Sequence, residues 1–318
     1  MENEQLYDFV AQRTARCKTL VVGDVMLDKY YYGEVTRISP EAPVPITHVL
    51  ETKETLGGAA NVAHNLALLG CETSIAGFVG EDYHCQSLEE RLTARAIDFR
   101  GLVHTNQPTT TKLRVIGGHQ QMLRLDFEEI DPPAPVYRER LQNYIEQKLN
   151  ESLDALILSD YGKGACTQQS CQAIINAAHA HGVPVIIDPK GSNWTKYEHA
   201  DYITPNLKEI NAVLLEPIRN EDKAVEKAAH YVMRKFKLRN VIVTRSEEGL
   251  SLVREEEVVH IPTKAQEVFD VSGAGDTVIA VFAMALAGGL SPRDGAYMAN
   301  LAATIPGVER TYVIDPDS

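Results

Sequence analysis

Short apolar runs rich in β-branched residues alternate with segments of helical periodicity along most of this 318-residue chain. Such alternation predicts a mostly parallel sheet covered by helices on both faces, in three layers. The length fits one large α/β domain or two small ones. The predicted strands span residues 18–23, 73–79, 155–158, 183–187, 202–204 and 240–244, and the predicted helices 57–69, 84–94, 137–149, 168–181, 207–215, 223–235 and 278–286.

Two segments depart from this alternation. Residues 30–35 and 44–50 form short strand-like pieces with prolines at 40, 43 and 45, which confine strands to sheet edges. Residues 109–116 and 121–127 form a strand pair around Gly117-Gly118. We expect these pieces, about 30–52 and 109–127, to form a small separate sheet that acts as a lid over the strand ends.

Charge and cysteine content restrict the partners and the compartment. A net charge of −13 argues against nucleic acid and against an anionic membrane surface as partners. Five scattered cysteines, with no Cys-x-x-Cys pair and no Cys/His metal spacing, are typical of a reducing compartment. The sequence contains no evident signal peptide and no run of 18 apolar residues, so we expect a cytoplasmic protein.

A glycine-rich turn, Val271-Ser-Gly-Ala-Gly-Asp-Thr277, directly precedes an apolar helical run. The backbone N–H groups of Gly273, Ala274 and Gly275, at the start of a helix, predict an anion site. Asp276 is unusual beside a site for plain phosphate binding, but a carboxylate there suits a general base that must reach an incoming hydroxyl group. The turn therefore indicates phosphoryl transfer to a hydroxyl group. Taken alone, it is equally compatible with an ordinary helix cap in a glycine-containing loop.

Four polar residues, Asp24, Asp160, Asp188 and Asn206, fall at or just past the ends of predicted strands, where ligands bind in parallel sheets. Asp24, Asp28 and Asp160 are candidates for contacts with the substrate, although for Asp24 or Asp28 alone an Asx turn or a helix cap is the simpler explanation. Gly57 and Gly58, with Asn61 one turn later, permit either close approach to a ligand or close helix–sheet packing.

Basic residues concentrate around the predicted lid in a chain that is otherwise acidic. Arg37, Lys112, Arg114 and Arg124 suggest a fixed anion on the substrate, such as a sugar phosphate, although each alone is more typical of a solvated surface. In glycine-containing loops after strands, Lys163 and Lys190 are positioned to reach phosphate.

The segment Thr204-Pro-Asn-Leu-Lys-Glu209 has two interpretations. Asn206 and Glu209 match a capping box at a helix start. They also match residues that organise metal-bound water, because Mg²⁺ keeps much of its water shell. The turn from Thr244 to Gly249 is a candidate for contact with a nucleotide. The chain lacks the Gly-x-x-x-x-Gly-Lys-Ser/Thr loop and the Gly-x-Gly-x-x-Gly motif after the first strand, which disfavours P-loop kinases and nicotinamide dehydrogenases.

Three of these segments, in this order, resemble signatures of the ribokinase (PfkB-type) family of sugar kinases: Gly57-Gly-Ala-Ala-Asn61, Thr204-Pro-Asn-Leu-Lys-Glu209 and Asp270-Val-Ser-Gly-Ala-Gly-Asp276. A narrower resemblance, over about residues 18–303, is to the D-glycero-β-D-manno-heptose 7-phosphate kinases, which make a precursor of ADP-heptose for lipopolysaccharide. Its motifs are Val22-Gly-Asp-Val-Met-Leu-Asp28, Arg37-Ile-Ser-Pro-Glu-Ala-Pro-Val-Pro45, Thr111-Lys-Leu-Arg114, Gln120-Gln-Met-Leu-Arg-Leu-Asp-Phe-Glu128, Leu158-Ser-Asp-Tyr-Gly-Lys-Gly164 and Ile187-Asp-Pro-Lys-Gly191.

This resemblance implies a single ribokinase-like domain over residues 1–318 that uses ATP and Mg²⁺ to phosphorylate the sugar 1-hydroxyl, with K⁺ as a further candidate ion. It assigns Asp276 as the base and the backbone of Gly273 to Gly275 as the anion hole. It implies that Asp24, Asp28, Gly58 and Asn61 hold the sugar, whereas the charge argument places Lys112, Arg114 and Arg124 at the 7-phosphate.

Glu209 would bind the metal through water, and a homodimer would form through the lid, whose apolar residues include Val44, Ile46 and Val49. The set expected on the nucleotide side is Asn206, Glu209, Lys208, Lys190, Thr244, Ser246, Gly249 and Asn300.

The chain departs from the family pattern in two places. Many relatives carry a fused nucleotidyltransferase with a His-x-Gly-His motif, which this sequence lacks, so we expect a stand-alone kinase or an excised domain. Residues 304–318 replace a Gly- and Val-rich stretch, and Pro306 should end the preceding helix early. Two alternatives to the heptose kinase are a kinase for another sugar, such as a hexose or ribose, and a non-catalytic regulator that binds a sugar phosphate.

Overall fold

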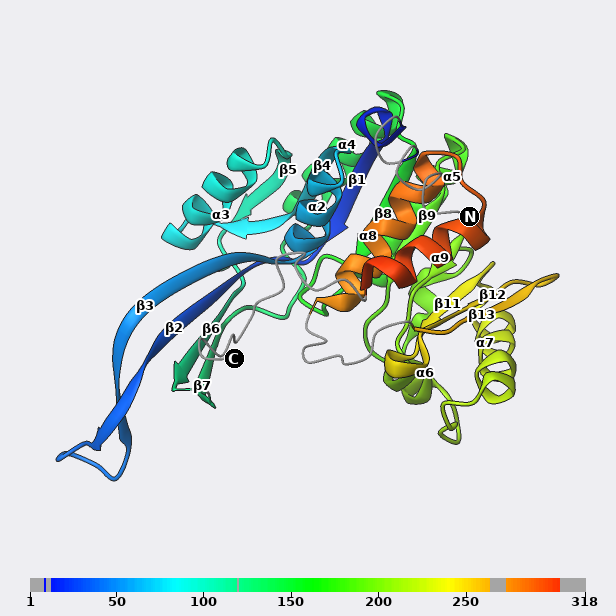
Figure 1. The fold of residues 1–318 in the computed structure, drawn as a ribbon. Coiled ribbons are helices and arrows are strands. Elements are labelled where there is room, and N and C mark those ends of the chain that lie inside the picture. Colours follow the sequence, from blue (N-terminus) through cyan, green and yellow to red (C-terminus); the bar gives the residue numbers. More distant parts are fainter. Residues whose placement is uncertain (1–8, 10–12, 119, 264–272, 304–318) are drawn as a thin grey trace.

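The computed structural model describes residues 9, 13–118, 120–263 and 273–303, whose strands form two sheets (Figure 1). The larger sheet has nine strands in the order β13-β12-β11-β10-β9-β8-β1-β4-β5. Strands β11 to β5 in this order run parallel to their neighbours, whereas β11–β12 and β12–β13 are antiparallel pairs. The bounds are β1 Lys18–Gly23, β4 Glu72–Gly80, β5 Asp98–Thr105, β8 Ala155–Ser159, β9 Val185–Asp188, β10 Tyr202–Ile203, β11 Val241–Thr244, β12 Leu250–Val253 and β13 Val258–Ile261.

Helices cover both faces of this sheet, because each inner strand buries side chains on both sides. In β1, Val21 belongs to one hydrophobic core, and Leu20 and Val22 belong to the other. The first core includes side chains from α2 (Ala59–Leu68), α3 (Tyr83–Ala94), α8 (Ala274–Ala287) and α9 (Pro292–Ala303). The second includes side chains from α4 (Pro135–Asn150), α5 (Gln168–Ala180), α6 (Leu207–Val213) and α7 (Asp222–Phe236). The predicted three-layer α/β/α architecture is confirmed.

Three strands of the large sheet were not predicted from the sequence. Strand β5 lies at one edge of the sheet, so it is only partly buried, and charged residues and Gly101 interrupt its apolar pattern. At the other edge, β13 is also mostly half-buried, and β12 is a four-residue strand. Such strands are defined by pairing with their neighbours, and a single-sequence pattern does not contain that information.

The smaller sheet has four strands in the order β3-β2-β6-β7, with bounds β2 Val25–Ile38, β3 Pro45–Gly58, β6 Thr111–Gly117 and β7 Gln120–Phe127. Strand β2 pairs with β3 in an antiparallel and with β6 in a parallel register. The predicted segments do form a separate sheet, but the short pieces expected within 30–52 are parts of two strands of 14 residues each. Pro45 is the first residue of β3, at the sheet edge, where a missing N–H is tolerated.

The two sheets are joined at the carboxyl end of β1. Only Asp24 separates β1 from β2. The return strand β3 ends at Gly58, and α2 begins at Ala59, two residues later than predicted. Gly58 has φ +55°, and the Ala59 N–H donates to the Asp24 carbonyl oxygen at 3.0 Å. The β2–β3 hairpin extends far from the helices (Figure 1), while its attachment lies at the end of β1, an inner strand of the large sheet between β8 and β4.

The polar residues that were expected at the strand ends do lie there. Asp24, Asp160, Asp188 and Asn206 all lie at or just after the carboxyl ends of parallel strands β1, β8, β9 and β10. Helix α8 begins near this edge, because Gly273 and Asp276 line one cleft together with Asp160 and Asp188. None of the described helices is long and apolar enough to cross a membrane.

Candidate active site

Asp276 lies in the first turn of α8, whose N-cap is Gly273 with φ +76°. Its carboxylate is almost fully buried and accepts two side-chain hydrogen bonds. Asn61 Nδ2 on α2 donates to Oδ2 at 2.6 Å, and the Tyr161 hydroxyl donates to Oδ1 at 2.7 Å. The chain thus brings together two separated sequence signatures, since Asn61 belongs to the Gly-Gly segment and Asp276 to the Gly-Ala-Gly turn.

The start of α8 also supplies backbone donors. The first N–H groups of a helix have no intrahelical acceptor, and this applies to Ala274, Gly275 and Asp276. Thr277 closes the turn, because its N–H and its hydroxyl both donate to the Gly273 carbonyl oxygen, at 3.0 and 3.1 Å. Gly275 is exposed, and a Cβ added there would meet no atom within 4 Å, so the backbone is accessible to a ligand. Asp270 to Ser272 of the same signature lie outside the described residues.

Burial raises the pKa of the Asp276 carboxyl above its ordinary value, and the negative charge of Asp28 acts in the same direction. The hydrogen bonds from Tyr161 and Asn61, together with the positive charge of Lys112, oppose this shift. A carboxylate with a raised pKa and fixed orientation is suited to accept a proton from a hydroxyl group.

Asp24 is buried, and its carboxylate holds the loop after β8. Oδ2 accepts the N–H groups of Tyr161 at 2.7 Å and Lys163 at 3.0 Å, and Oδ1 accepts the N–H of Ala165 at 3.0 Å. Burial raises its pKa despite these bonds. The sugar-binding role predicted for Asp24 is not tested by this geometry, but both its oxygens already support the loop.

Asp160 is similarly occupied by protein groups. Its carboxylate accepts from Lys196 Nζ, from the Tyr197 hydroxyl at 2.5 Å and from the Gly162 N–H at 2.7 Å. Its side chain has no exposed surface. We therefore infer that Asp160 supports the loop that carries Tyr161, while a direct contact with substrate stays a prediction.

The face of the small sheet that meets this site carries charged residues in cross-strand rows. Asp28 is opposite Lys112, and Lys112 is opposite Asp126. Arg114 Nη1 donates to Asp28 Oδ1 at 2.6 Å. The Lys112 ammonium lies 5.4 Å from the Tyr161 ring centroid, and burial lowers its pKa. Among the described residues, no carboxylate oxygen lies within 4.0 Å of the Lys112 ammonium, although Asp28 is part of its electrostatic environment.

The other predicted basic residues are placed differently. Arg124 is opposite Arg114 in the sheet but is largely exposed and paired with Asp126 at 2.9 Å. Lys163 is paired with Glu128 at 2.6 Å. Arg37 lies near the far end of β2, about 30 Å from Asp28 at about 3.3 Å per residue. The expected basic cluster therefore contains Lys112, Arg114 and Arg124, but does not contain Arg37 of the same chain.

The glycines of the earlier signature are required by close contacts. A Cβ on Gly57 would collide with the Asp28 carboxylate, and one on Gly58 would lie 2.5 Å from the Asp24 carbonyl oxygen. These contacts support the packing interpretation of the Gly-Gly pair. They also keep Asp28 and Asn61 close to the end of β1, so the same glycines position candidate substrate residues.

A cleft of about 530 Å³ opens beside Asp276 on the side of β9, β10 and β11. Its walls include one lysine, Lys190, and four carboxylates, and its full lining is Asp160, Tyr161, Asp188, Pro189, Lys190, Thr204, Asn206, Glu209, Thr244, Gly273, Gly275 and Asp276. Lys190 Nζ lies 3.8 Å from Glu209 Oε1. An acidic cleft of this kind favours a ligand that brings a cation with it.

Asn206 and Glu209 form the capping box considered from the sequence. The Asn206 N–H donates to Glu209 Oε2 at 3.0 Å, and the Glu209 N–H donates to Asn206 Oδ1 at 2.9 Å. The capping-box interpretation of this segment is therefore confirmed. The other carboxylate oxygen of Glu209, Oε1, faces Lys190 and the cleft. Burial raises the pKa of Glu209, and burial with the charges of Asp276 and Glu209 raises that of Asp188 well above its ordinary value. A divalent cation would relieve this concentration of negative charge, so the donor set fits Mg²⁺.

The remaining nucleotide-side candidates do not all meet the cleft. Thr244 lines it, whereas Lys208 and Ser246 are exposed and absent from its lining. Gly249 has φ +82° and closes the turn into β12, where a Cβ would collide with the Ile261 carbonyl oxygen. Asn300 donates to the Pro262 carbonyl oxygen at 3.1 Å. Residues 304–318, in which the sequence departs from the family, lie outside the described residues.

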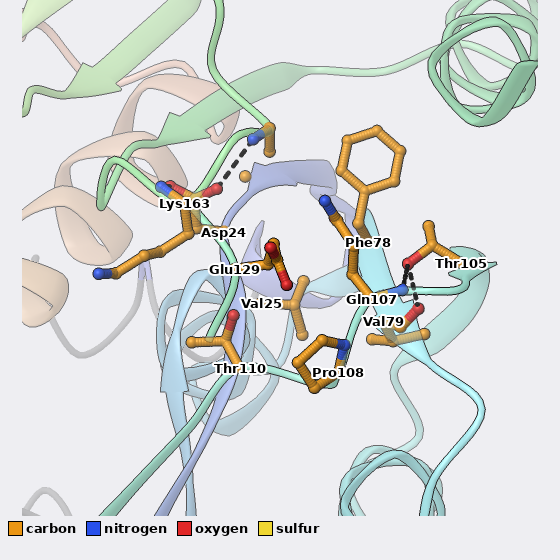
Figure 2. Close-up of a pocket in the computed structure, with 12 residues that line it drawn as sticks. Asp24, Val25, Phe78, Val79, Thr105, Gln107, Pro108, Thr110, Glu129 and Lys163 are labelled. Atoms are coloured by element: carbon orange, nitrogen blue, oxygen red, sulfur yellow. Dashed lines mark hydrogen bonds between the residues drawn. The ribbon is translucent and has the colours of Figure 1, made fainter. Parts of the chain in front are cut away.

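A smaller hollow lies beside Asp24, between β4, the end of β5 and the segment that leads into β6 (Figure 2). Lys163 and Glu129 line it, and the Thr105 hydroxyl donates a hydrogen bond to the Val79 carbonyl oxygen at 3.2 Å. Its charged groups are two carboxylates and one lysine, so it is less suited than the Lys112 region to hold an anion.

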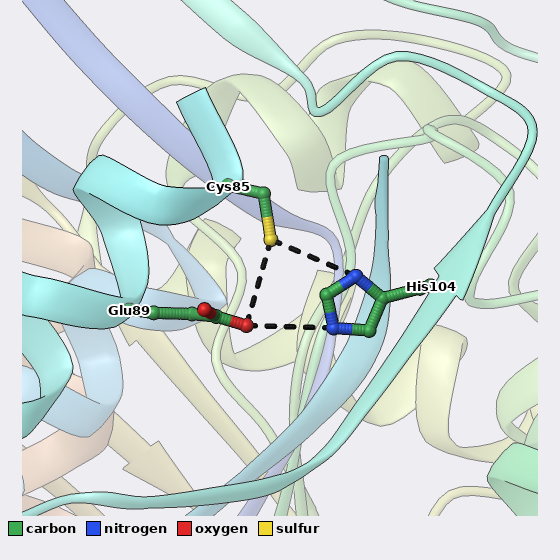
Figure 3. Close-up of side chains that lie close together, drawn as sticks. All are labelled: Cys85, Glu89 and His104. Carbon is green, nitrogen blue, oxygen red and sulfur yellow. Dashed lines mark hydrogen bonds and ion pairs between the residues drawn. The ribbon is translucent and has the colours of Figure 1, made fainter. Parts of the chain in front are cut away.

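Cys85, Glu89 and His104 meet between α3 and β5, although no Cys/His metal spacing was recognised in the sequence (Figure 3). The Cys85 thiol is 3.7 Å from Glu89 Oε1, and His104 Nε2 is 3.4 Å from the same oxygen. Burial raises the pKa of the Cys85 thiol to about 12. The three groups satisfy one another as a hydrogen-bonded set, which accounts for their proximity without an ion.

Tyr161 is the site residue that sequence reasoning missed. It lies in the quoted segment Ser159-Asp-Tyr-Gly-Lys-Gly164, where only Asp160 and Lys163 were singled out. The sequence did contain a signal for Tyr161. It is a polar aromatic residue just after a predicted strand, and it lies between two candidate site residues.

Residues 18–310 match the pfkB family carbohydrate kinase pattern. The chain is 44% identical over 289 residues to the bifunctional protein HldE of Actinobacillus pleuropneumoniae serotype 5b, covering 91% of this chain and 59% of that protein. It is 46% identical over 291 residues to HldE of Hahella chejuensis, again covering 91% of this chain and 59% of the relative. The chain thus spans about three-fifths of the length of these curated relatives.

Solved structures show the same fold. A ribokinase from Thermotoga maritima superposes with a TM-score of 0.69 at 25% identity, covering 91% of this chain and 92% of that one. Phosphofructokinase-2 from Escherichia coli superposes with a TM-score of 0.73 at 18% identity, covering 91% and 93%.

We expect Asp24→Ala to destabilise the protein by about 3 kcal/mol or more, because it leaves three N–H groups of the Tyr161 loop without their acceptor. Asp24→Asn should cost less, since its amide oxygen still accepts. Urea denaturation measures both changes, and amide exchange at Tyr161, Lys163 and Ala165 should accelerate in the alanine variant. Equal stability of Asp24→Ala and wild type would contradict this role.

Proposed function

Because the chain belongs to the pfkB family of carbohydrate kinases, we propose that it transfers the γ-phosphoryl group of ATP to the anomeric hydroxyl of D-glycero-D-manno-heptose 7-phosphate. The product would be heptose 1,7-bisphosphate, a precursor of ADP-heptose for the lipopolysaccharide core. The observation that carries this proposal is the buried Asp276 carboxylate at the N-terminus of α8, facing a basic sheet surface. The motif resemblance supplies the identity of the sugar, and the matched HldE proteins support it.

In the proposed reaction, Asp276 accepts the proton of the sugar 1-hydroxyl while that oxygen bonds to the γ-phosphorus and the bond to ADP breaks. The backbone N–H groups of Gly273, Ala274 and Gly275 would donate to the transferring phosphoryl group and neutralise the charge on its oxygens. The helix dipole adds to this stabilisation. Asn61 holds the opposite oxygen of the base, so a single orientation of the carboxylate is maintained.

ATP would occupy the cleft lined by Asn206, Thr244 and Lys190. Asp188 and Glu209 would hold Mg²⁺ through its water shell, and the ion would screen the phosphate charges from the acidic walls. Lys190 would approach a phosphate directly, since its ammonium is half exposed and only loosely paired with Glu209.

Lys112 is the strongest candidate for binding the 7-phosphate. Its ammonium is partly desolvated, and no described carboxylate is in ion-pair contact with it. Arg114, on the same strand face, adds a guanidinium whose partner is Asp28. A dianionic phosphate bound between them would form charge-assisted hydrogen bonds in a partly buried setting.

The small sheet is also the proposed dimer interface. Its long hairpin exposes apolar side chains far from the hydrophobic cores, among them Val44, Val49 and Leu50. An exposed hairpin of this length is stabilised when another surface covers it. In such a dimer, Arg37 would be able to reach the partner's site, which it does not reach in its own chain.

We expect Asp276→Asn to lower kcat by about 10²- to 10⁴-fold while ATP binding changes little, because the amide keeps the shape but cannot accept the proton. In the wild type, kcat/KM should fall as the pH drops through the raised pKa of Asp276, since only the ionised form accepts a proton. Coupled ADP release with Mg²⁺, ATP and heptose 7-phosphate measures both. Substantial activity in Asp276→Asn would exclude it as the base, and a wild type inactive in this assay but able to bind the sugar phosphate would indicate the non-catalytic regulator.

We expect Lys112→Met to raise KM for heptose 7-phosphate by about 10- to 100-fold. This change corresponds to the loss of one charge-assisted hydrogen bond, which contributes about 1.5–3 kcal/mol to binding. Lys112→Arg is the matched control and should retain most of the affinity. Steady-state kinetics with the phosphorylated sugar and with its unphosphorylated form separates the phosphate contact from general damage. If wild type uses the unphosphorylated sugar equally well, the substrate is another sugar.

We expect Leu50→Glu to shift the protein from dimer to monomer, because it places a charge in the proposed interface. Leu50 is 63% exposed in the single chain, and Leu215, between α6 and α7, is 93% exposed. Leu215→Glu is therefore the matched control and should leave the assembly unchanged. Sedimentation velocity gives the result, and a dimer that persists in Leu50→Glu, or a monomeric wild type, would contradict this interface.

A further inference from the structure

The loop that follows β8 is fixed by four of its backbone N–H groups, which donate to two buried carboxylates. Gly162 and Gly164, with φ of +71° and +100°, give the loop its tight course. Two carboxylates accept hydrogen bonds from its backbone. Asp24 accepts three N–H groups, and Asp160 accepts the N–H of Gly162. Because the Tyr161 N–H is itself one of these donors, the backbone of Tyr161 has little freedom to move.

The side chain of this fixed residue ends on the proposed base. The Tyr161 hydroxyl donates to Asp276 Oδ1 at 2.7 Å, and Asn61 donates to Oδ2 at 2.6 Å. Burial and the neighbouring carboxylates raise the pKa of Tyr161 well above its ordinary value, so the phenol remains a donor over the working pH range. An oxygen of a carboxylate has two lone pairs, so Oδ1 can accept this bond and still accept a substrate hydroxyl.

The other charged groups that face Asp276 come from different elements. Asp28 on β2 and Asp188 at the end of β9 are negative, and Lys112 on β6 is positive. Lys112 also lies over the Tyr161 ring, so the tyrosine is in contact with both the small sheet and the base. With two carboxylates nearby and almost complete burial, the ionised form of Asp276 depends on its two hydrogen-bond donors and on the positive charge of Lys112.

We propose that Tyr161 is a positioning residue of the kinase reaction, whose hydroxyl orients the Asp276 carboxylate toward the acceptor hydroxyl and preserves its ionised form. This inference rests on the proposed role of Asp276 as the base. It adds a function for the Asp24 network: the three backbone bonds place the Tyr161 hydroxyl within hydrogen-bond distance of Asp276.

The test is the pH profile of kcat/KM for Tyr161→Phe. Loss of the donor should move the acid limb to higher pH by about one unit, and kcat on the plateau should fall about tenfold, with KM for ATP unchanged. Tyr144→Phe on α4 is the matched control. Its hydroxyl donates to Asp98 at 3.5 Å and the residue does not line the cleft beside Asp276, so this variant should leave the acid limb in place.

Site-specific 3-fluorotyrosine at position 161 provides a second measurement if Tyr161→Phe is poorly folded. The substituted phenol keeps the hydroxyl and is a stronger donor, so the acid limb should move to lower pH. An unmoved limb in both variants would overturn the proposal. A lower sugar KM in Tyr161→Phe with unchanged kcat would also overturn it, because the hydroxyl would then compete with the substrate.

These outcomes are separate from failure of the proposed function. If Asp276→Asn stays active, the base assignment fails before Tyr161 is considered. If Asp276→Asn is inactive and Tyr161→Phe behaves as wild type, only the inference about Tyr161 fails.

Discussion

The Asp24 carboxylate at the end of β1 is the interaction on which the rest of the site depends. It accepts three backbone N–H groups from the loop after β8, while its carbonyl oxygen accepts the N–H that starts α2. One residue therefore fixes the positions of Tyr161 and Asn61, the two donors to Asp276. A buried carboxylate is costly unless its hydrogen bonds are complete, and here the backbone completes them.

The distribution of charge around Asp276 would allow an acidic protein to bind the two anionic substrates of the proposed reaction. The cleft on the side of β9 to β11 has carboxylate walls and needs an accompanying cation, whereas the small sheet presents Lys112 and Arg114. Asp276 lies between these two regions, at a helix N-terminus. In the proposed reaction, the metal-bound nucleotide and the sugar phosphate would approach from chemically different sides, which favours one orientation of each.

The sequence predicted the architecture well, because strands such as β1 and β8 are continuous apolar runs and a helix such as α7 buries apolar residues at regular helical spacing. It also placed Asp24, Asp160, Asp188 and Asn206 at the strand ends. It did not separate residues that hold the loop from residues free to bind a ligand, because that difference depends on partners distant in the chain: Asp160 with Lys196, and Lys163 with Glu128. Arg37 was grouped with Lys112 by charge alone, and only the length of β2 shows how far apart they are.

The attachment of the β2–β3 hairpin has a mechanical consequence. The hairpin leaves the large sheet through Asp24 and returns through Gly58 directly into the helix that carries Asn61, so its base coincides with the supports of Asp276. A strand of 14 residues is about 45 Å long. A rotation of a few degrees where the hairpin joins the large sheet therefore displaces its far end by several ångströms. The tip of the hairpin and the residues that hold the Asp276 carboxylate are thereby joined through one continuous pair of strands.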